Sequence, residues 1–229
     1  MSVAINKEEF VSRMSEALGE EVSQSPTEDQ IRRYFRTLIN NSQDAIDAYI
    51  GYASLFFVHV GQSHNPRADV VYPGGSGRDI CDSFSEVLAR REERGRHIID
   101  CRGFSIMGVG LMREAGFGSV QYMIAVPPSA TGDSWQGHVF VRMSSPDGRR
   151  IYLGNNHIYN SPSGAVEGLA GWSPEASLNV RYGVGDTYQE ALEDAIDLVR
   201  ERDEDPSSDD SVVAPLSARR SRTPTLREE

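Results

Sequence analysis

The sequence predicts an α+β protein in which a helix that begins with a cysteine packs on an antiparallel sheet, after a helical N-terminal part. Two observations predict this class. Apolar residues recur three or four positions apart through most of the first 60 residues, which is typical of helices packed on a core. Beyond residue 118, short segments alternate between apolar and polar residues, which is typical of strands with one buried face.

Three helices are expected in the N-terminal part. The first covers residues 6–19, with Asn6 as its N-terminal cap and Gly19 as its stop. The second begins near Ser25, and the third runs from about Ser42 to Val60. Their apolar stripes indicate burial against the rest of the protein, and an arm that binds a partner is the alternative.

A glycine-rich stretch over residues 61–77 separates these helices from the remainder. Its glycines lack the lysine and the spacing of a P-loop, so we expect a connector rather than a phosphate site. A charged helix is expected next, over Asp79–Arg94. It contains Cys81, but no apolar helix follows that cysteine, so we expect a structural thiol there.

The segment Asp100–Gly116 carries the chemistry that we expect of this chain. Cys101 opens it, and apolar residues follow at helical spacing, namely Phe104, Met107, Leu111 and Ala115. In the first turn of a helix, unpaired backbone N–H groups and the helix dipole favour a thiolate over a thiol. The sequence therefore predicts Cys101 as a nucleophile, with Cys81 as its rival.

A hairpin is expected downstream of this helix. Residues 119–126 predict one strand, and residues 137–143 predict a second. A strong turn follows at Asp147-Gly148, after which residues 149–153 return as the partner strand.

His138 is the expected general base, because it opens the outgoing strand of this hairpin. It should lie at the same end as Asn155 and Asn156, which follow the returning strand. The side-chain oxygen of either asparagine can accept a hydrogen bond from the imidazole and fix its tautomer. His157 is the alternative base. Trp135 either walls an acyl pocket or anchors its own loop.

This order of residues resembles the transglutaminase-like superfamily of cysteine enzymes. An Asp-Cys pair opens a helix, a strand follows, a histidine heads the next strand, and a polar residue closes the strand after it. The resemblance covers roughly residues 78–160 and implies a papain-like core. It implies that Cys101 is the nucleophile, His138 the base and Asn155 the orienting residue, where the superfamily usually has an aspartate.

The resemblance also implies a reaction. The expected enzyme transfers an acyl group from protein or peptide amide bonds through a thioester, as a peptidase, a glutamine deamidase or a transglutaminase, and it needs no cofactor. A catalytically silent fold of the same type that serves as a binding module is the alternative.

We expect three regions along the chain. They are an N-terminal helical region and connector over residues 1–77, a catalytic core over residues 78–202 and a disordered tail over residues 203–229. A helix over Thr187–Arg202 should close the core, and Thr187 and Glu190 have the spacing of a capping box. The tail is acidic and rich in serine, proline and arginine, with almost nothing to bury.

Composition limits the classes of partner. The 229 residues carry a formal net charge of -11, which argues against a nucleic acid or an anionic membrane surface and favours a protein or peptide substrate. The two cysteines show no metal-site spacing and are too few for a disulfide scaffold. The start has no apolar segment of signal-peptide length. We therefore expect a soluble, cytoplasmic protein without a metal. Export by a signal-less route stays open, and the pattern predicts no oligomeric state.

Overall fold

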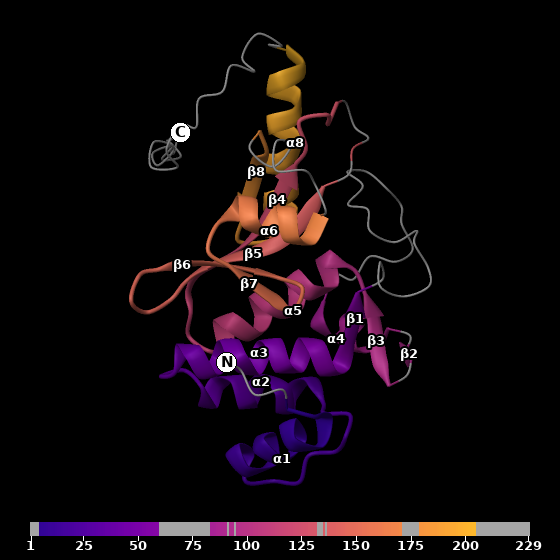
Figure 1. The fold of residues 1–229 in the computed structure, drawn as a ribbon, viewed down its shortest axis with the longest axis vertical. Helices are drawn as coiled ribbons and strands as arrows, with labels where there is room; N and C mark the ends of the chain where they lie inside the picture. Colours follow the sequence, from indigo (N-terminus) through magenta and orange to yellow (C-terminus); the bar gives the residue numbers. More distant parts are fainter. Residues whose placement is uncertain are drawn as a thin grey trace, which may run out of the picture.

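The computed structural model describes residues 5–59, 83–90, 92–93, 95–131, 135, 137–170 and 179–204. Helices combine with a five-stranded antiparallel sheet, so the predicted α+β class is confirmed. In Figure 1 the N-terminal helices lie at one end, a central helix lies between them and the sheet, and the last helix lies at the other end. No helix among the described residues is long and apolar enough to cross a membrane.

Three helices form the N-terminal part, and polar residues cap their starts. They are α1 (Lys7–Leu18), α2 (Glu28–Thr37) and α3 (Ser42–Phe56). Asn6 accepts from the backbone N–H of Glu9, and Gly19 ends α1 with a φ of 65°, which glycine adopts without strain. Thr27 and Gln30 form a capping box at the start of α2. The three predicted helices are therefore confirmed.

The third helix ends earlier than predicted, at Phe56 rather than near Val60. A small sheet follows, made of β1 (Phe57–His59), β2 (Glu92–Glu93) and β3 (Arg96–Ile99). β1 pairs in parallel with β3, which is far away in the sequence. The apolar run through Phe57 and Val58 fits either a helix or a strand, so only this distant partner decides between them.

The helix predicted over Asp79–Arg94 is much shorter among the described residues. α4 covers only Phe84–Leu88, with Ser83 as its cap, and the end of the predicted range pairs as β2 instead. Cys81 lies outside the described residues. The predicted boundary after residue 77 and the tail beyond Glu204 also lie outside them.

The central helix α5 (Cys101–Glu114) is buried along most of its length. The main sheet follows it, in the order β7-β6-β5-β4-β8 with antiparallel neighbours. Its strands are β4 (Gly118–Val126), β5 (His138–Ser144), β6 (Arg150–Gly154), β7 (His157–Tyr159) and β8 (Arg181–Gly185). β5 and β6 pair around Asp147-Gly148, so the predicted hairpin is confirmed.

Different helices cover the two faces of this sheet. Val139 and Val141 of β5 belong to the large hydrophobic cluster that contains α5. Phe140 packs in a second cluster with Ala165 of α6 (Pro162–Ala170). Because successive side chains of a strand point to opposite faces, the position of a β5 residue determines whether it faces α5 or α6.

The last helix, α8 (Tyr188–Glu204), covers the α5 side of the sheet next to β8. A side chain at Gly183 of β8 would collide with the backbone of α8 at Ala191, so glycine permits this close approach. Thr187 and Glu190 form both hydrogen bonds of the predicted capping box. The predicted closing helix is therefore confirmed.

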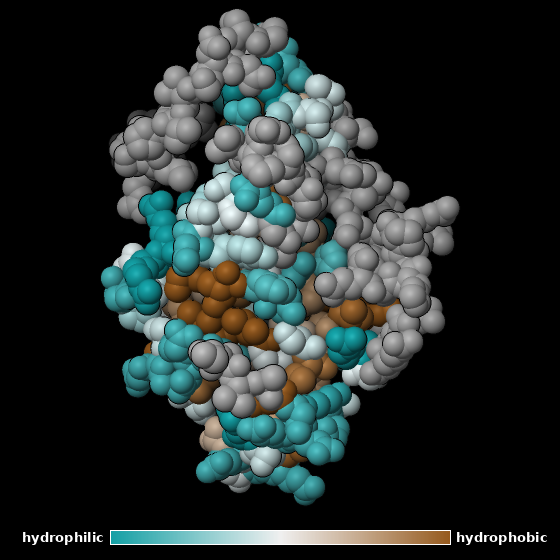
Figure 2. Space-filling model, viewed as in Figure 1, coloured by the Kyte–Doolittle hydropathy of each residue, from teal (hydrophilic) through white to brown (hydrophobic). Residues whose placement is uncertain are grey.

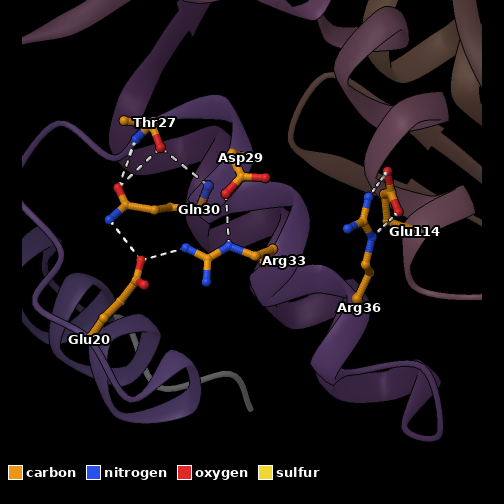
Figure 3. A network of polar contacts seen from close by, with 7 residues as sticks. All are labelled: Glu20, Thr27, Asp29, Gln30, Arg33, Arg36 and Glu114. Carbon is orange, nitrogen blue, oxygen red and sulfur yellow. Dashed lines mark hydrogen bonds and ion pairs between the residues drawn. The ribbon is translucent and has the colours of Figure 1, made fainter.

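Polar contacts connect the N-terminal helices to one another and to α5 (Figure 3). Glu20 accepts from Nη2 of Arg33 at 2.6 Å and from Nε2 of Gln30 at 3.1 Å. Arg36 of α2 donates from Nε to Oε2 of Glu114 at 2.6 Å, which joins α2 to the end of α5. The N-terminal helices also share one hydrophobic cluster with α5, so they pack on the core as expected.

Candidate functional site

Cys101 is the first residue of α5. Asp100 caps the helix by accepting from the backbone N–H of Gly103 at 2.8 Å, and Asp is among the residues that suit this position. Ser105 donates its hydroxyl to the carbonyl of Cys101 at 2.9 Å. The cysteine is 3% exposed. The thiol therefore lies at the positive end of a buried helix, as the sequence predicts.

Contacts from two directions fix α5 in position. Tyr49 of α3 donates its hydroxyl to the carbonyl of Phe104 at 3.0 Å. Gly108 lies over the sheet, where an added Cβ would come within 3.1 Å of Val141 and 3.3 Å of Leu153. The helix that carries Cys101 is thus packed between α3 and the β5–β6 hairpin, which restricts its movement.

His138 is the first residue of β5, as expected, but its ring lies on the α6 side of the sheet. It pairs with Ala125 of β4, which belongs to the second cluster. Its imidazole is nearly parallel to the ring of Phe140, with centroids 6.3 Å apart and an interplanar angle of 18°. Cys101 belongs to the first cluster. The alternation of β5 therefore does not direct His138 toward the layer that holds Cys101.

Asn155 follows β6 and lies at the His138 end of the hairpin. β5 and β6 pair at Val141 and Leu153, so the residues before Val141 and after Leu153 are at one end. Asn155 has a φ of 51°, and its Oδ1 is buried without a hydrogen-bond partner among the described residues. Such an oxygen is available to orient an imidazole or to bind a substrate N–H.

Asn156, the other candidate for this role, has a structural contact. It donates from Nδ2 to the hydroxyl of Ser54 on α3 at 3.0 Å. This bond engages the amide nitrogen of Asn156 and fixes the β6–β7 turn to α3. His157, the alternative base, is exposed on β7, with its ring 6.4 Å from that of Tyr159.

A further histidine, His59, lies next to the start of α5. His59 ends β1 and pairs in register with Ile99, two residues before Cys101. Its ring stacks on Phe104 of α5 with centroids 6.1 Å apart. The sequence pattern predicts that a helix continues to about Val60, so His59 is expected at the end of a helix and not in a strand that pairs with the segment before Cys101.

Charged groups gather around the same end of α5. Desolvation raises the pKa of Asp100, while the Gly103 N–H and the charges of His59 and Arg102 act to lower it. The Arg102 guanidinium carbon lies 3.8 Å from the ring centre of Tyr188 on α8. Burial raises the pKa of Tyr188 to about 12 against the opposing charge of Arg102. α8 therefore borders the site beside Cys101.

Trp135 is buried on the α5 side of the sheet, where the sequence suggested a pocket wall or a loop anchor. It is 5% exposed and belongs to the first cluster. A side chain at Gly137 would collide with its indole ring, so the glycine makes room for it. Its Nε1 is buried without a hydrogen-bond partner among the described residues. Trp135 thus has an unused buried donor, as Asn155 has an unused buried acceptor.

Within the described part of the chain, no group of three or more histidine, cysteine, aspartate or glutamate side chains could hold a metal ion. No protein-family model matches the chain, and neither a curated protein nor a solved structure is significantly similar to it.

Proposed function

We propose that this protein is a cysteine-dependent acyl-transfer enzyme with a transglutaminase-like, papain-like core, and that Cys101 is its nucleophile. The observation that carries the proposal is the place of Cys101, capped by Asp100, at the start of a helix that is buried along most of its length. At a helix N-terminus, backbone N–H groups can stabilise negative charge on the sulfur and on a nearby oxyanion.

The order of elements supports the same proposal. After α5 come three consecutive antiparallel strands, β4, β5 and β6, with His138 at the head of β5 and Asn155 just after β6. This is the order on which the resemblance to the transglutaminase-like superfamily depends. In the superfamily scheme His138 is the base, and Asn155 orients its imidazole.

The proposed reaction proceeds in two steps. The thiol proton moves to a base, and the electron pair left on sulfur attacks the carbonyl carbon of a protein or peptide amide. The nitrogen leaves as an amine or as ammonia after it receives a proton, and a thioester remains on Cys101. Water then releases the acid, as in a peptidase or deamidase, or an amine takes the acyl group, as in a transglutaminase.

A catalytically silent binding module is the second candidate, and one specific observation favours it. The imidazole of His138 lies on the α6 side of the sheet, beside Phe140, and not in the layer of Cys101. Figure 2 also shows hydrophobic residues gathered in the middle of one face, over β6 and β7, within a mostly hydrophilic surface. Apolar surface of this kind commonly binds partners.

Mass spectrometry of glutamine-containing peptides, incubated with the protein in the presence and absence of a primary amine, separates these candidates. Amide hydrolysis, deamidation and amine incorporation each change the peptide mass in a different way. We expect one of these products with the wild-type protein and with Cys81→Ser, and none with Cys101→Ser. A product that persists in Cys101→Ser would contradict the proposal, and no product from any protein or peptide substrate tested would favour the binding module.

A further inference from the structure

We infer that His59, and not His138, is the base that takes the proton from Cys101, an inference that rests on the proposed role of Cys101 as nucleophile. His59 and Cys101 come from segments about 40 positions apart in the sequence. The β1–β3 ladder brings the two segments together at the start of α5.

The ladder fixes where His59 lies. β1 and β3 pair in parallel at Phe57 with His97, Val58 with Ile98, and His59 with Ile99. β3 then passes through Asp100 directly into α5. Neighbouring strands are roughly 4.8 Å apart, so the backbone of His59 lies beside the chain as it enters the helix.

The side chain of His59 is directed toward α5. Its ring stacks on Phe104 with an interplanar angle of 27°, and Phe57, two residues earlier on the same face of β1, contacts the same ring at 6.3 Å. Phe104 is three residues after Cys101, so the two side chains occupy neighbouring positions on one side of the helix. The imidazole therefore lies against the first turn of α5, next to the position of Cys101.

Charged groups surround the same end of α5. Desolvation raises the pKa of Asp100, and the charges of His59, Arg102 and Arg90 act to lower it, so the carboxyl lies within electrostatic range of the His59 side chain. Tyr188 borders the same end of α5 from α8. Asp100 is thus a positioning residue that holds the helix start close to His59.

The proton balance is simple. The S–H bond of Cys101 breaks, its electron pair stays on sulfur, and the proton forms an N–H bond on the His59 ring. The imidazolium later gives this proton to the nitrogen that leaves the amide carbon. His138 takes no part in this step, because its ring lies on the α6 side of the sheet.

The test is the rate of alkylation of Cys101 by iodoacetamide between pH 5.5 and 8.5, with the modified site mapped by mass spectrometry. The variants are His59→Gln, His59→Asn and His138→Gln, each checked by thermal unfolding. His97→Gln is the matched control, because His97 is an imidazole on the neighbouring strand that packs on Phe57 and bonds to the Arg90 carbonyl.

We expect both His59 variants to lose about tenfold or more of the rate near pH 6 and to follow the profile of an ordinary thiol, whose pKa is about 8.5. His138→Gln and His97→Gln should keep the wild-type profile. Loss of the fast rate in His138→Gln, with His59→Gln unchanged, would overturn the inference and leave the proposed function standing. A wild-type Cys101 that already behaves as an ordinary thiol would instead overturn the proposed function.

Discussion

Tyr49 of α3 donates its buried hydroxyl to the carbonyl of Phe104 on α5, at 3.0 Å. This bond connects the N-terminal helices to the helix that carries Cys101, one turn from the cysteine itself. Burial raises the pKa of Tyr49, so the hydroxyl keeps its proton and remains a donor. The N-terminal part of the chain therefore helps to position the candidate site.

Replacing Tyr49 by phenylalanine should lower the free energy of unfolding by about 1 kcal/mol, because the buried Phe104 carbonyl loses one partner. Urea unfolding measures this change. Tyr34→Phe is the control, since the Tyr34 hydroxyl makes no hydrogen bond within the described residues, and it should unfold like the wild type. Equal unfolding midpoints for the two variants would show that the Tyr49 bond adds nothing.

Alanine at Gly108 and at Gly110 should have opposite effects. Both residues lie in α5, where alanine is favoured over glycine by about 1 kcal/mol. At Gly110 the nearest atom to an added Cβ is the end of the Arg32 side chain at 3.5 Å, so we expect stabilisation. At Gly108 the Cβ would crowd Val141 at 3.1 Å, so we expect a lower unfolding temperature. Stabilisation of both variants would mean that α5 can move away from the sheet.

Replacing Asp100 by asparagine should change the stability of the fold and the reactivity of Cys101 in opposite directions. Desolvation raises the pKa of Asp100 above its usual 3.8. The protonated carboxyl therefore stabilises the fold, and this stabilisation is lost as the pH rises through the raised pKa. Asparagine also caps helices and carries no charge. We expect the variant to gain stability relative to the wild type as the pH rises above about 4, measured by thermal unfolding.

The same variant should alkylate Cys101 more slowly at neutral pH, because a proton that moves from Cys101 to His59 places positive charge near residue 100, and asparagine has no negative charge to stabilise it. Ser105→Ala is the control, since it removes a hydrogen bond to the Cys101 carbonyl without changing charge. An Asp100→Asn protein that is less stable at every pH and reacts normally would contradict both expectations.

Replacing Glu114 by glutamine should change how the free energy of unfolding depends on pH in the acidic range. The hydrogen bond from Arg36 lowers the pKa of Glu114 below its usual 4.5, against a smaller effect of desolvation. The ionised form therefore stabilises the fold above about pH 4.5, and this contribution is lost as the pH falls through the lowered pKa. We expect the variant to be less stable than the wild type at pH 7 and the difference to shrink at low pH. A difference that stays constant across the pH range would mean that the charge of Glu114 does not contribute.

The elements that the sequence predicted correctly depend on local signals. Asn6 and Gly19 mark the ends of α1 within a few residues of the helix itself, and the Asp147-Gly148 turn fixes which strands of the hairpin pair. Cys101 at the start of α5 is likewise a local feature, because Asp100 caps the helix from the preceding position.

The remaining features depend on partners far away in the sequence. β1 exists because Phe57–His59 pairs with β3, and this pairing is what brings His59 to α5. The side of the sheet on which His138 lies depends on its exact register with Ala125, because a shift by one residue moves a side chain to the opposite face. Neither the ladder nor the register leaves a pattern in the local sequence.

The pH dependence of Cys101 alkylation in the wild-type protein, with the urea-unfolded chain as the reference, decides whether Cys101 is an activated nucleophile. We expect the native rate at Cys101 to fall only a few-fold between pH 8.5 and 6, whereas the unfolded chain should lose roughly 100-fold, as expected for a thiol with a pKa near 8.5. A native Cys101 that loses as much as the unfolded chain, or that does not react at any pH, would contradict an activated nucleophile at this position.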